Sequence, residues 1–287
     1  MPKTIASGFS VLKSNLEITS LQKSTVSTRQ TNVRIAVGKG FNVLDSFLAG
    51  SYPRATMLSP LSKSDIDIFV ILNSEYFHTY SPSKLLDKLR SVLKTTYPKT
   101  PKISRNGQAV TITFTDFKVD VVPCFKRKGG GYLIPNSITD KWIPTNPTVH
   151  HNNLTKENDW HDGNLIPLIK MIKGWNRSIN NAFNSFYLEL LIEKILAGVT
   201  ITDFPSGVRY IFDKGREAIK YKIVDPAGFG DEINGLNNVG TVEDAIKKFE
   251  TAYNRAIKAE DYASNGNIEL AFLEWQKIFP NYFPNYR

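Results

Sequence analysis

The chain reads LDSFLAGSYPRATMLSPLSKSDIDIFVIL over residues 44–72, and this stretch holds its most informative pattern. Near the end of the stretch, Asp65 and Asp67 alternate with apolar residues at period two, which predicts a strand over residues 65–72. Side chains two positions apart on a strand lie on the same face, about 7 Å from each other. Two carboxylates in that arrangement repel each other unless a cation lies between them. The pair therefore indicates a cation site on one face of a sheet.

A third carboxylate, Asp120, lies inside another apolar stretch, FKVDVVPCF, at residues 117–125. That stretch and residues 109–115 predict the two strands of a hairpin, with its tight connection at Asp116. An isolated charge is costly to bury in such a strand. If the strand is a neighbour of residues 65–72, three carboxylates converge. Hard oxygen ligands of this kind suit Mg²⁺, and two such ions stabilise the attacking and leaving oxygens in phosphoryl transfer.

Gly50 and Ser51 precede the acidic strand. A glycine lets the backbone come close to a phosphate, and a serine offers both an N–H and a hydroxyl donor. A Gly-Ser pair alone is typical of any loop, and the aspartates alone also fit exposed strand ends. The ordered combination of the Gly-Ser pair, the Asp-x-Asp strand and the third aspartate is much more specific for phosphoryl transfer.

The 287 residues include 36 Lys and Arg against 27 Asp and Glu, which gives a formal net charge of +9. This excess suggests a polyanionic partner: nucleic acid, a membrane surface or nucleotide phosphates. The single cysteine, Cys124, excludes an internal disulfide and a cysteine-based zinc cluster. The N-terminus lacks the apolar run of a signal peptide, and charged residues interrupt the most apolar later stretch, residues 186–196. We therefore expect a soluble, cytoplasmic protein that does not enter a membrane.

The pattern of apolar residues divides the chain into a mixed α/β half and a mostly helical half. Over residues 20–48, apolar spacings of three, four and seven predict one long helix that ends at Gly50. A polar, turn-rich connection is expected over residues 146–153. We expect residues 1–155 to form a catalytic lobe that includes the long helix, and residues 156–287 to form a helical lobe. Further helices are predicted over residues 82–93, 165–177, 183–196, 242–262 and 268–279.

At these residues the sequence resembles the DNA-polymerase-β-like nucleotidyltransferase superfamily. It looks most like the bacterial cGAS/DncV-like nucleotidyltransferases, the CD-NTases of the CBASS anti-phage signalling systems. The resemblance covers about residues 40–230. Beyond the carboxylates it includes LIPLIKMIKGWNRS at residues 165–178, NSFYLELL at residues 184–191 and the Val-Asp-Pro that contains Asp225. These later segments distinguish the CD-NTases from other nucleotidyltransferases.

The resemblance implies a polymerase-β-like lobe of mixed sheet and helices, a helical lobe like that of oligoadenylate synthase, and a nucleotide cleft between them. It also implies roles for the carboxylates. Asp65, Asp67 and Asp120 would be the catalytic residues and would ligate two Mg²⁺ ions, for which Mn²⁺ could substitute. Asp120 would also help to deprotonate the acceptor hydroxyl. Gly50 and Ser51 would hold the donor triphosphate.

The same resemblance implies nucleotide contacts from the second half of the chain. Lys173 and Ser185 match residues that contact the donor triphosphate, and Phe186 matches an aromatic residue that stacks on the donor base. Asp225 is a weaker nucleotide-binding candidate. From the residues alone, ordinary roles remain open: a lysine that reaches solvent beside an apolar stripe, a helix cap with core aromatics, and a turn at Asp225-Pro226.

The activity that the resemblance implies is synthesis of a cyclic di- or trinucleotide second messenger with release of pyrophosphate. The substrates would be NTPs, ATP and/or GTP or also pyrimidine NTPs, and the product would act on a downstream effector. Nucleic acid would not be required. The excess positive charge would then serve triphosphates, with a surface role for part of it left open. Two alternatives remain open. One is a template-independent transferase that makes linear oligonucleotides or nucleotidylates an RNA or a protein, and the other is a non-catalytic nucleic-acid-binding sensor.

Overall fold

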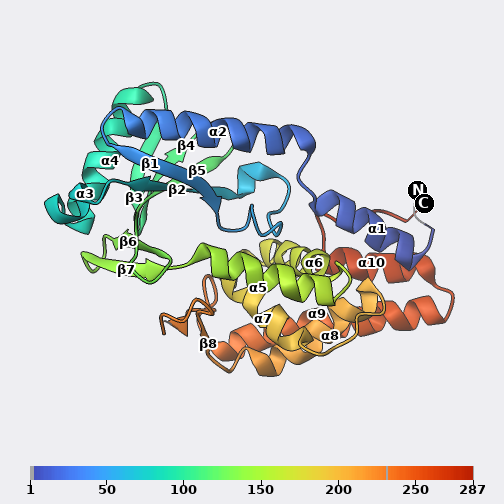
Figure 1. Ribbon diagram of the computed structural model, residues 1–287. Helices are drawn as coiled ribbons and strands as arrows, with labels where there is room; N and C mark the ends of the chain where they lie inside the picture. Colours follow the sequence, from blue (N-terminus) through green and yellow to red (C-terminus); the bar gives the residue numbers. More distant parts are fainter. Residues whose placement is uncertain (1–2, 231, 287) are drawn as a thin grey trace. The chain divides into compact units, whose positions relative to one another are not determined.

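The computed structural model describes residues 3–230 and 232–286 (Figure 1). The chain divides into two compact units. One comprises residues 18–152, and the other combines the described residues up to Glu17 with those from Asn153 onward. The division lies three residues before the one expected at 155/156. Residues 3–17 differ from the expectation, because they belong to the helical unit and not to the sheet unit.

The first unit is built on a mixed sheet with the strand order β1-β2-β5-β4-β3. β6 pairs with β5, and β7 pairs with β6. β1 and β2 are antiparallel, β2 and β5 are parallel, and β5, β4 and β3 are antiparallel in turn. Its elements are α2 (Ser20–Gly38), β1 (Val43–Ala49), a short 3-10 turn (Leu61–Lys63), β2 (Asp65–Leu72), α3 (Glu75–Thr79), α4 (Pro82–Thr96), β3 (Lys102–Asn106), β4 (Ala109–Thr113), β5 (Lys118–Lys126), β6 (Tyr132–Asn136) and β7 (Lys141–Thr145).

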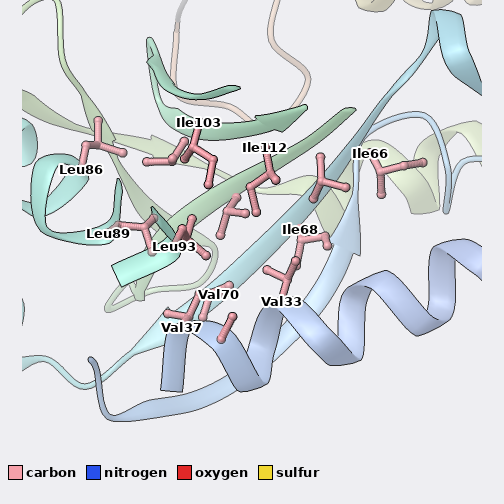
Figure 2. Packing of buried hydrophobic residues seen from close by; sticks show 14 of the residues in the cluster. Val33, Val37, Ile66, Ile68, Val70, Leu86, Leu89, Leu93, Ile103 and Ile112 are labelled. Atoms are coloured by element: carbon pink, nitrogen blue, oxygen red, sulfur yellow. The ribbon is translucent and has the colours of Figure 1, made fainter. Parts of the chain in front are cut away.

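The two faces of this sheet differ because side chains alternate along each strand. Figure 2 shows one face, where side chains from the strands pack against those of α2 and α4 in a continuous apolar core. Its labelled members include Val33, Val37, Ile66, Ile68, Val70, Leu86, Leu89, Leu93, Ile103 and Ile112. The residues in between, among them Asp65, Asp67 and Phe69, lie on the opposite face. That face therefore carries both polar side chains and a second, smaller apolar cluster around Phe69 and Cys124.

The prediction of one helix over residues 20–48 is wrong. α2 ends at Gly38, and residues 43–49 form the strand β1, which pairs with β2. A Cβ at Gly40 would lie 2.3 Å from the Cγ2 atom of Val92, so the chain passes close to α4 between the two elements. The apolar residues of β1 fit a helical spacing as well as a strand, and the pairing with β2 selects the strand.

The predictions for residues 65–72, 82–93 and the hairpin of residues 109–125 are confirmed by β2, α4 and the pair β4–β5. The polar connection expected over residues 146–153 is wrong, because these residues lie mostly in the helix α5 (Pro147–Trp160). Pro147 at its first position suits a helix start, where no N–H is needed.

The second unit is helical. It contains α1 (Ile5–Leu16), α6 (Leu165–Ser178), α7 (Ser185–Leu196), α8 (Phe204–Ala218), α9 (Val242–Ser264) and α10 (Ile268–Ile278), with the short strands β8 (Ile223–Val224) and β9 (Glu232–Ile233). The predicted helices at α6, α7, α9 and α10 are confirmed, whereas α1 and α8 were not anticipated. Trp175 of α6 lies at the centre, where its ring contacts Phe183, Phe212 and Phe249 at centroid distances of 5.0–5.6 Å.

The two ends of the chain explain why residues 3–17 belong to this unit. Phe9 of α1 is buried, and its ring contacts those of Trp275 in α10 at 4.8 Å and of Phe283 near the C-terminus at 5.3 Å. The Asn15 side chain also donates to the carbonyl of Tyr282 at 2.8 Å. Among the described residues, no helix has both the length and the apolar character needed to cross a membrane.

Candidate functional site

The strand register brings the three predicted carboxylates onto one face of the sheet. In the parallel pair β2–β5, Asp67 lies directly opposite Asp120, and Asp65 lies opposite Lys118. Since side chains two residues apart share a face, Asp65 lies on the same side as Asp67 and Asp120. Asp65 is exposed, while Asp67 and Asp120 are half-buried. The condition set by the sequence, that residues 65–72 and 117–125 form neighbouring strands, is therefore met.

Asp120 is held by a hydrogen bond from the neighbouring strand β4. The hydroxyl of Thr111, the residue opposite it on β4, donates a hydrogen bond to its Oδ1 atom at 2.5 Å. The pKa of the Asp120 carboxyl is raised above its ordinary value, and burial is the largest cause. The charge of Asp65 raises the pKa as well, while the Thr111 hydroxyl and the charge of Lys118 lower it. Thr111 itself is buried. Our sequence analysis missed Thr111, although the hairpin register contains the signal: strands joined at Asp116 place residues 111 and 120 opposite each other.

Gly50 lies against one of these carboxylates. It follows β1, whose last residue, Ala49, pairs with Asp67. Its φ of +65° is a left-handed conformation that L side chains rarely adopt. A Cβ at this position would lie 1.9 Å from Oδ2 of Asp67. Only glycine therefore lets the turn after β1 pass this close to the Asp67 carboxylate.

The turn that begins at Gly50 is compact. The Ser51 carbonyl accepts a hydrogen bond from the N–H of Thr56 at 3.0 Å, and Arg54 and Thr56 are buried. Ser51 is half-buried. The turn is thus held in place by its own hydrogen bonds and by burial, and it lies at the end of the sheet that carries the acidic residues.

The residues on this face suit a hard divalent cation in chemistry and in register. Three carboxylates on neighbouring positions of two strands supply oxygen donors, and their mutual repulsion is relieved by a cation. The three carboxylates do not by themselves form a complete metal site. Within the described part of the chain, no three His, Cys, Asp or Glu side chains are grouped closely enough to hold an ion. Mg²⁺ is usually bound by one or two carboxylates, with water and substrate phosphate as the other ligands, so an open arrangement fits it.

The other predicted nucleotide-binding residues lie in the helical unit, so the structure groups the nine candidates into two sets. The set in the sheet unit consists of Gly50, Ser51 and the three aspartates. The set in the helical unit consists of Lys173, Ser185, Phe186 and Asp225.

Lys173 does not reach solvent as an isolated lysine would. Its Nζ atom lies 2.7 Å from Oε1 of Glu189 on α7, and both side chains are buried, with 7% and 1% of their surface exposed.

Glu189 is a second residue that the sequence analysis missed. A carboxylate buried to this extent needs a partner, and Lys173 supplies it. The signal in the sequence is a glutamate inside an otherwise apolar helical segment, SFYLELLI, at residues 185–192. The pairing itself becomes visible only once α6 and α7 are packed together.

Ser185 and Phe186 lie in the first turn of α7. The side chain of Asn184 caps this helix and accepts hydrogen bonds from the N–H groups of Phe186 at 2.9 Å and Tyr187 at 3.1 Å. Ser185 is therefore not the cap, and it is exposed, while Phe186 is half-buried. The hydroxyl of the next residue, Tyr187, donates to the carbonyl of Tyr221 at 3.4 Å.

Asp225 follows β8 and begins a turn. Its carboxylate accepts from the N–H of Ala227 at 2.8 Å, and its carbonyl accepts from the N–H of Gly228 at 3.1 Å. This is the turn conformation that aspartate favours. The turn seen as an alternative in the sequence is thus formed, and a nucleotide contact by Asp225 stays a prediction.

The chain is similar to known proteins in sequence and in fold. Residues 3–158 match the model of the Second Messenger Oligonucleotide or Dinucleotide Synthetase domain (SMODS). The chain is 26% identical over 258 residues to a cyclic AMP-AMP-AMP synthase from an Acinetobacter species, which covers 83% of this chain and 72% of that protein. A probable cyclic nucleotide synthase from Bacillus cereus is 24% identical, with 83% of this chain and 81% of that protein covered.

Solved structures show the same fold. The structure of CdnC from Escherichia coli MS115-1 with ATP superposes with a TM-score of 0.73 at 17% identity, over 98% of this chain and 99% of that one. The cyclic AMP-GMP synthase DncV of Vibrio cholerae gives a TM-score of 0.70 at 16% identity, over 98% of this chain and 87% of that one. With the family model matched over more than half of its residues, the chain belongs to the family of second messenger oligonucleotide or dinucleotide synthetases.

Proposed function

We propose that this cyclic nucleotide synthase joins NTPs into a cyclic di- or trinucleotide and releases pyrophosphate, and that the product serves as a second messenger in anti-phage signalling. The observation that carries the proposal is the register that places Asp65, Asp67 and Asp120 on one face, beside the turn at Gly50. Relatives that make cyclic AMP-AMP-AMP or cyclic AMP-GMP, and the solved complex of CdnC with ATP, support NTPs as substrates.

In the proposed reaction, a ribose hydroxyl of one NTP attacks the α-phosphorus of another. A new P–O bond forms, the bond to the β-phosphate breaks, and pyrophosphate leaves with the electron pair. Asp120 takes the proton of the attacking hydroxyl, directly or through a water. The N–H and hydroxyl groups of Ser51 and the backbone of Gly50 bind the donor triphosphate. Each NTP in the product takes part in one such transfer, and the last transfer, within the linear intermediate, closes the ring and releases the last pyrophosphate.

We further propose that Asp65, Asp67 and Asp120 hold two Mg²⁺ ions, which would neutralise the triphosphate charge. This chemistry depends mainly on positioning and on charge stabilisation. The chain's contribution is therefore the geometry of the sheet face that carries Asp65, Asp67 and Asp120, here called the acidic face. β2, β5 and the turn at Gly50 determine this geometry.

Phosphatase treatment of the product separates the proposed activity from a linear transferase. We expect the wild-type protein, incubated with radiolabelled NTPs and Mg²⁺, to release pyrophosphate and to form a product from which phosphatase removes no phosphate. A linear oligonucleotide keeps a terminal phosphate that phosphatase removes, so a fully phosphatase-sensitive product would overturn the cyclic assignment. Binding of nucleic acid without any release of pyrophosphate would favour the sensor alternative instead.

A second prediction separates the structural role of Lys173, as the partner of Glu189, from its proposed role in nucleotide binding. The substitution K173M leaves the buried Glu189 without the ammonium that lies 2.7 Å from it, so we expect it to lower the free energy of unfolding by about 3–5 kcal/mol. In K173M/E189M no charge is left at this position, and the stability is expected to return to about the wild-type level. If Lys173 contacts the triphosphate, the double variant still has an NTP KM raised by about 10-fold or more, since a hydrogen bond to a charged group contributes about 1.5–3 kcal/mol.

The matched control is K170M. Lys170 lies one turn earlier on α6 and is also buried, but its partner, Glu17, is 47% exposed. We expect K170M to leave the NTP KM unchanged. Chemical unfolding and steady-state kinetics are the measurements, and a stable K173M/E189M variant with the wild-type KM would confine Lys173 to a structural role.

A further inference from the structure

The hydrogen bond from Thr111 to Asp120 is part of the acidic face but has no place in the reaction described so far. It joins two strands, β4 and β5, and the residues at its ends are direct register partners. The distance of 2.5 Å between Thr111 Oγ1 and Asp120 Oδ1 is short, as expected when a hydroxyl donates to an ionised carboxylate. Thr111 is buried, with 8% of its surface exposed.

We infer that Thr111 is a positioning residue, which holds the Asp120 carboxylate in the orientation needed to bind the divalent cation. The inference rests on the proposed function, because it assigns Asp120 to cation binding. A carboxylate that binds a cation through one oxygen must keep that oxygen turned toward the ion. Thr111 donates to Oδ1, and both lone pairs of Oδ2 are left for a cation or a proton.

The surroundings explain why such a tether is useful. Asp65 and Asp67 lie on the same face, and their charges repel the Asp120 carboxylate. Without a donor on β4, that repulsion favours rotation of Asp120 away from the other two. The hydrogen bond from Thr111 holds Oδ1 on the β4 side and so limits how far the carboxylate rotates before any cation has bound. Partners that orient the ligands of a metal typically change its affinity or the activity by about 10–100-fold when they are removed.

The two neighbours of Asp120 across the sheet thus have different tasks. Asp67, opposite it on β2, shares the cation, and Thr111, opposite it on β4, sets the orientation. Serine carries the same hydroxyl, whereas valine has nearly the same shape without it. The exchange of threonine for valine therefore removes the hydrogen bond and little else, and valine also suits a strand.

The test compares T111V, T111S and the control T113V. Thr113 lies on the same strand and on the same face, two residues from Thr111, opposite Lys118. We expect T111V to bind Mn²⁺ about 10-fold more weakly or worse, as measured by electron paramagnetic resonance on the protein without nucleotide. Its kcat should fall by about 10–100-fold with little change in the NTP KM, since the triphosphate contacts remain. T111S is expected to retain the Mn²⁺ affinity and the kcat to within about threefold, and T113V to match the wild type.

Two results would overturn the inference. One is a folded T111V protein with wild-type Mn²⁺ affinity and kcat. The other is a T111S protein as impaired as T111V, because then the hydroxyl is not what matters. If T111V does not fold, T111S alone decides. Wild-type Mn²⁺ affinity in T111S then supports the inference, and a weakened affinity overturns it. These outcomes are distinct from failure of the proposed function, which would appear as wild-type turnover in a protein that lacks Asp65 and Asp67.

Discussion

Replacement of both Asp65 and Asp67 by alanine is expected to lower NTP turnover by at least about 10³-fold, while the protein remains folded. The two residues supply two of the three carboxylates on the acidic face of β2 and β5. A bound cation contributes several kcal/mol to charge stabilisation in the transition state. A loss of about 4 kcal/mol corresponds to about 10³-fold in rate. Pyrophosphate release under saturating NTP measures the effect.

The fold is expected to survive because neither side chain is part of the apolar core. Asp65 is exposed and Asp67 half-buried, and the charge of Asp65 raises the pKa of the Asp120 carboxyl. Removal of both negative charges relieves this repulsion, so the melting temperature in the absence of divalent cations should stay the same or rise.

The control for this prediction is D45A. Asp45 also lies on the sheet, in β1, but it is exposed and pairs with Arg34 at 3.0 Å, a surface contact that contributes little to stability. D45A should keep wild-type turnover and melting temperature. Wild-type turnover in a folded D65A/D67A protein would remove the acidic face from the mechanism.

The substitution G50A is expected to affect both stability and activity. A left-handed backbone conformation costs an alanine about 1–2 kcal/mol, and the added Cβ would lie 1.9 Å from Oδ2 of Asp67. Either the turn or the carboxylate must move. A displacement of about 1 Å in a catalytic geometry can lower the rate about 10²-fold, and we expect at least that loss in kcat/KM for NTPs.

The structure offers a control that separates backbone strain from steric overlap. Gly107, in the turn between β3 and β4, has a φ of +60°, but nothing lies within 4 Å of the position of its Cβ. G107A should therefore lower the free energy of unfolding by about 1–2 kcal/mol and leave kcat/KM unchanged. If G50A resembles G107A in both measurements, the close approach to Asp67 does not matter for activity.

The acidic face could be predicted because its signals are local. The alternation that defines β2 is contained in eight residues, and the hairpin of β4 and β5 is marked by the turn at Asp116. Period-two alternation on two neighbouring strands is then enough to place the carboxylates on one side. That β2 and β5 are neighbours and run parallel was not predicted, because their pairing joins segments about 50 residues apart along the chain.

The features that escaped prediction depend on contacts between distant segments. The residues of β1 carry apolar side chains at spacings that a helix and a strand share, and only the pairing with β2 decides between them. The ion pair of Lys173 and Glu189 requires α6 and α7 to be packed together. The membership of residues 3–17 in the helical unit depends on Phe9 meeting Trp275, more than 260 residues away along the chain.

The central claim is that the protein closes NTPs into a ring, and mass spectrometry of its products tests this most directly. The wild-type protein is incubated with all four NTPs and Mg²⁺ or Mn²⁺, treated with phosphatase, and compared with D65A/D67A. We predict a product with the mass of a cyclic di- or trinucleotide, resistant to phosphatase and absent from the variant. Formation of linear products alone would contradict this prediction, and so would formation of the same cyclic product by the variant.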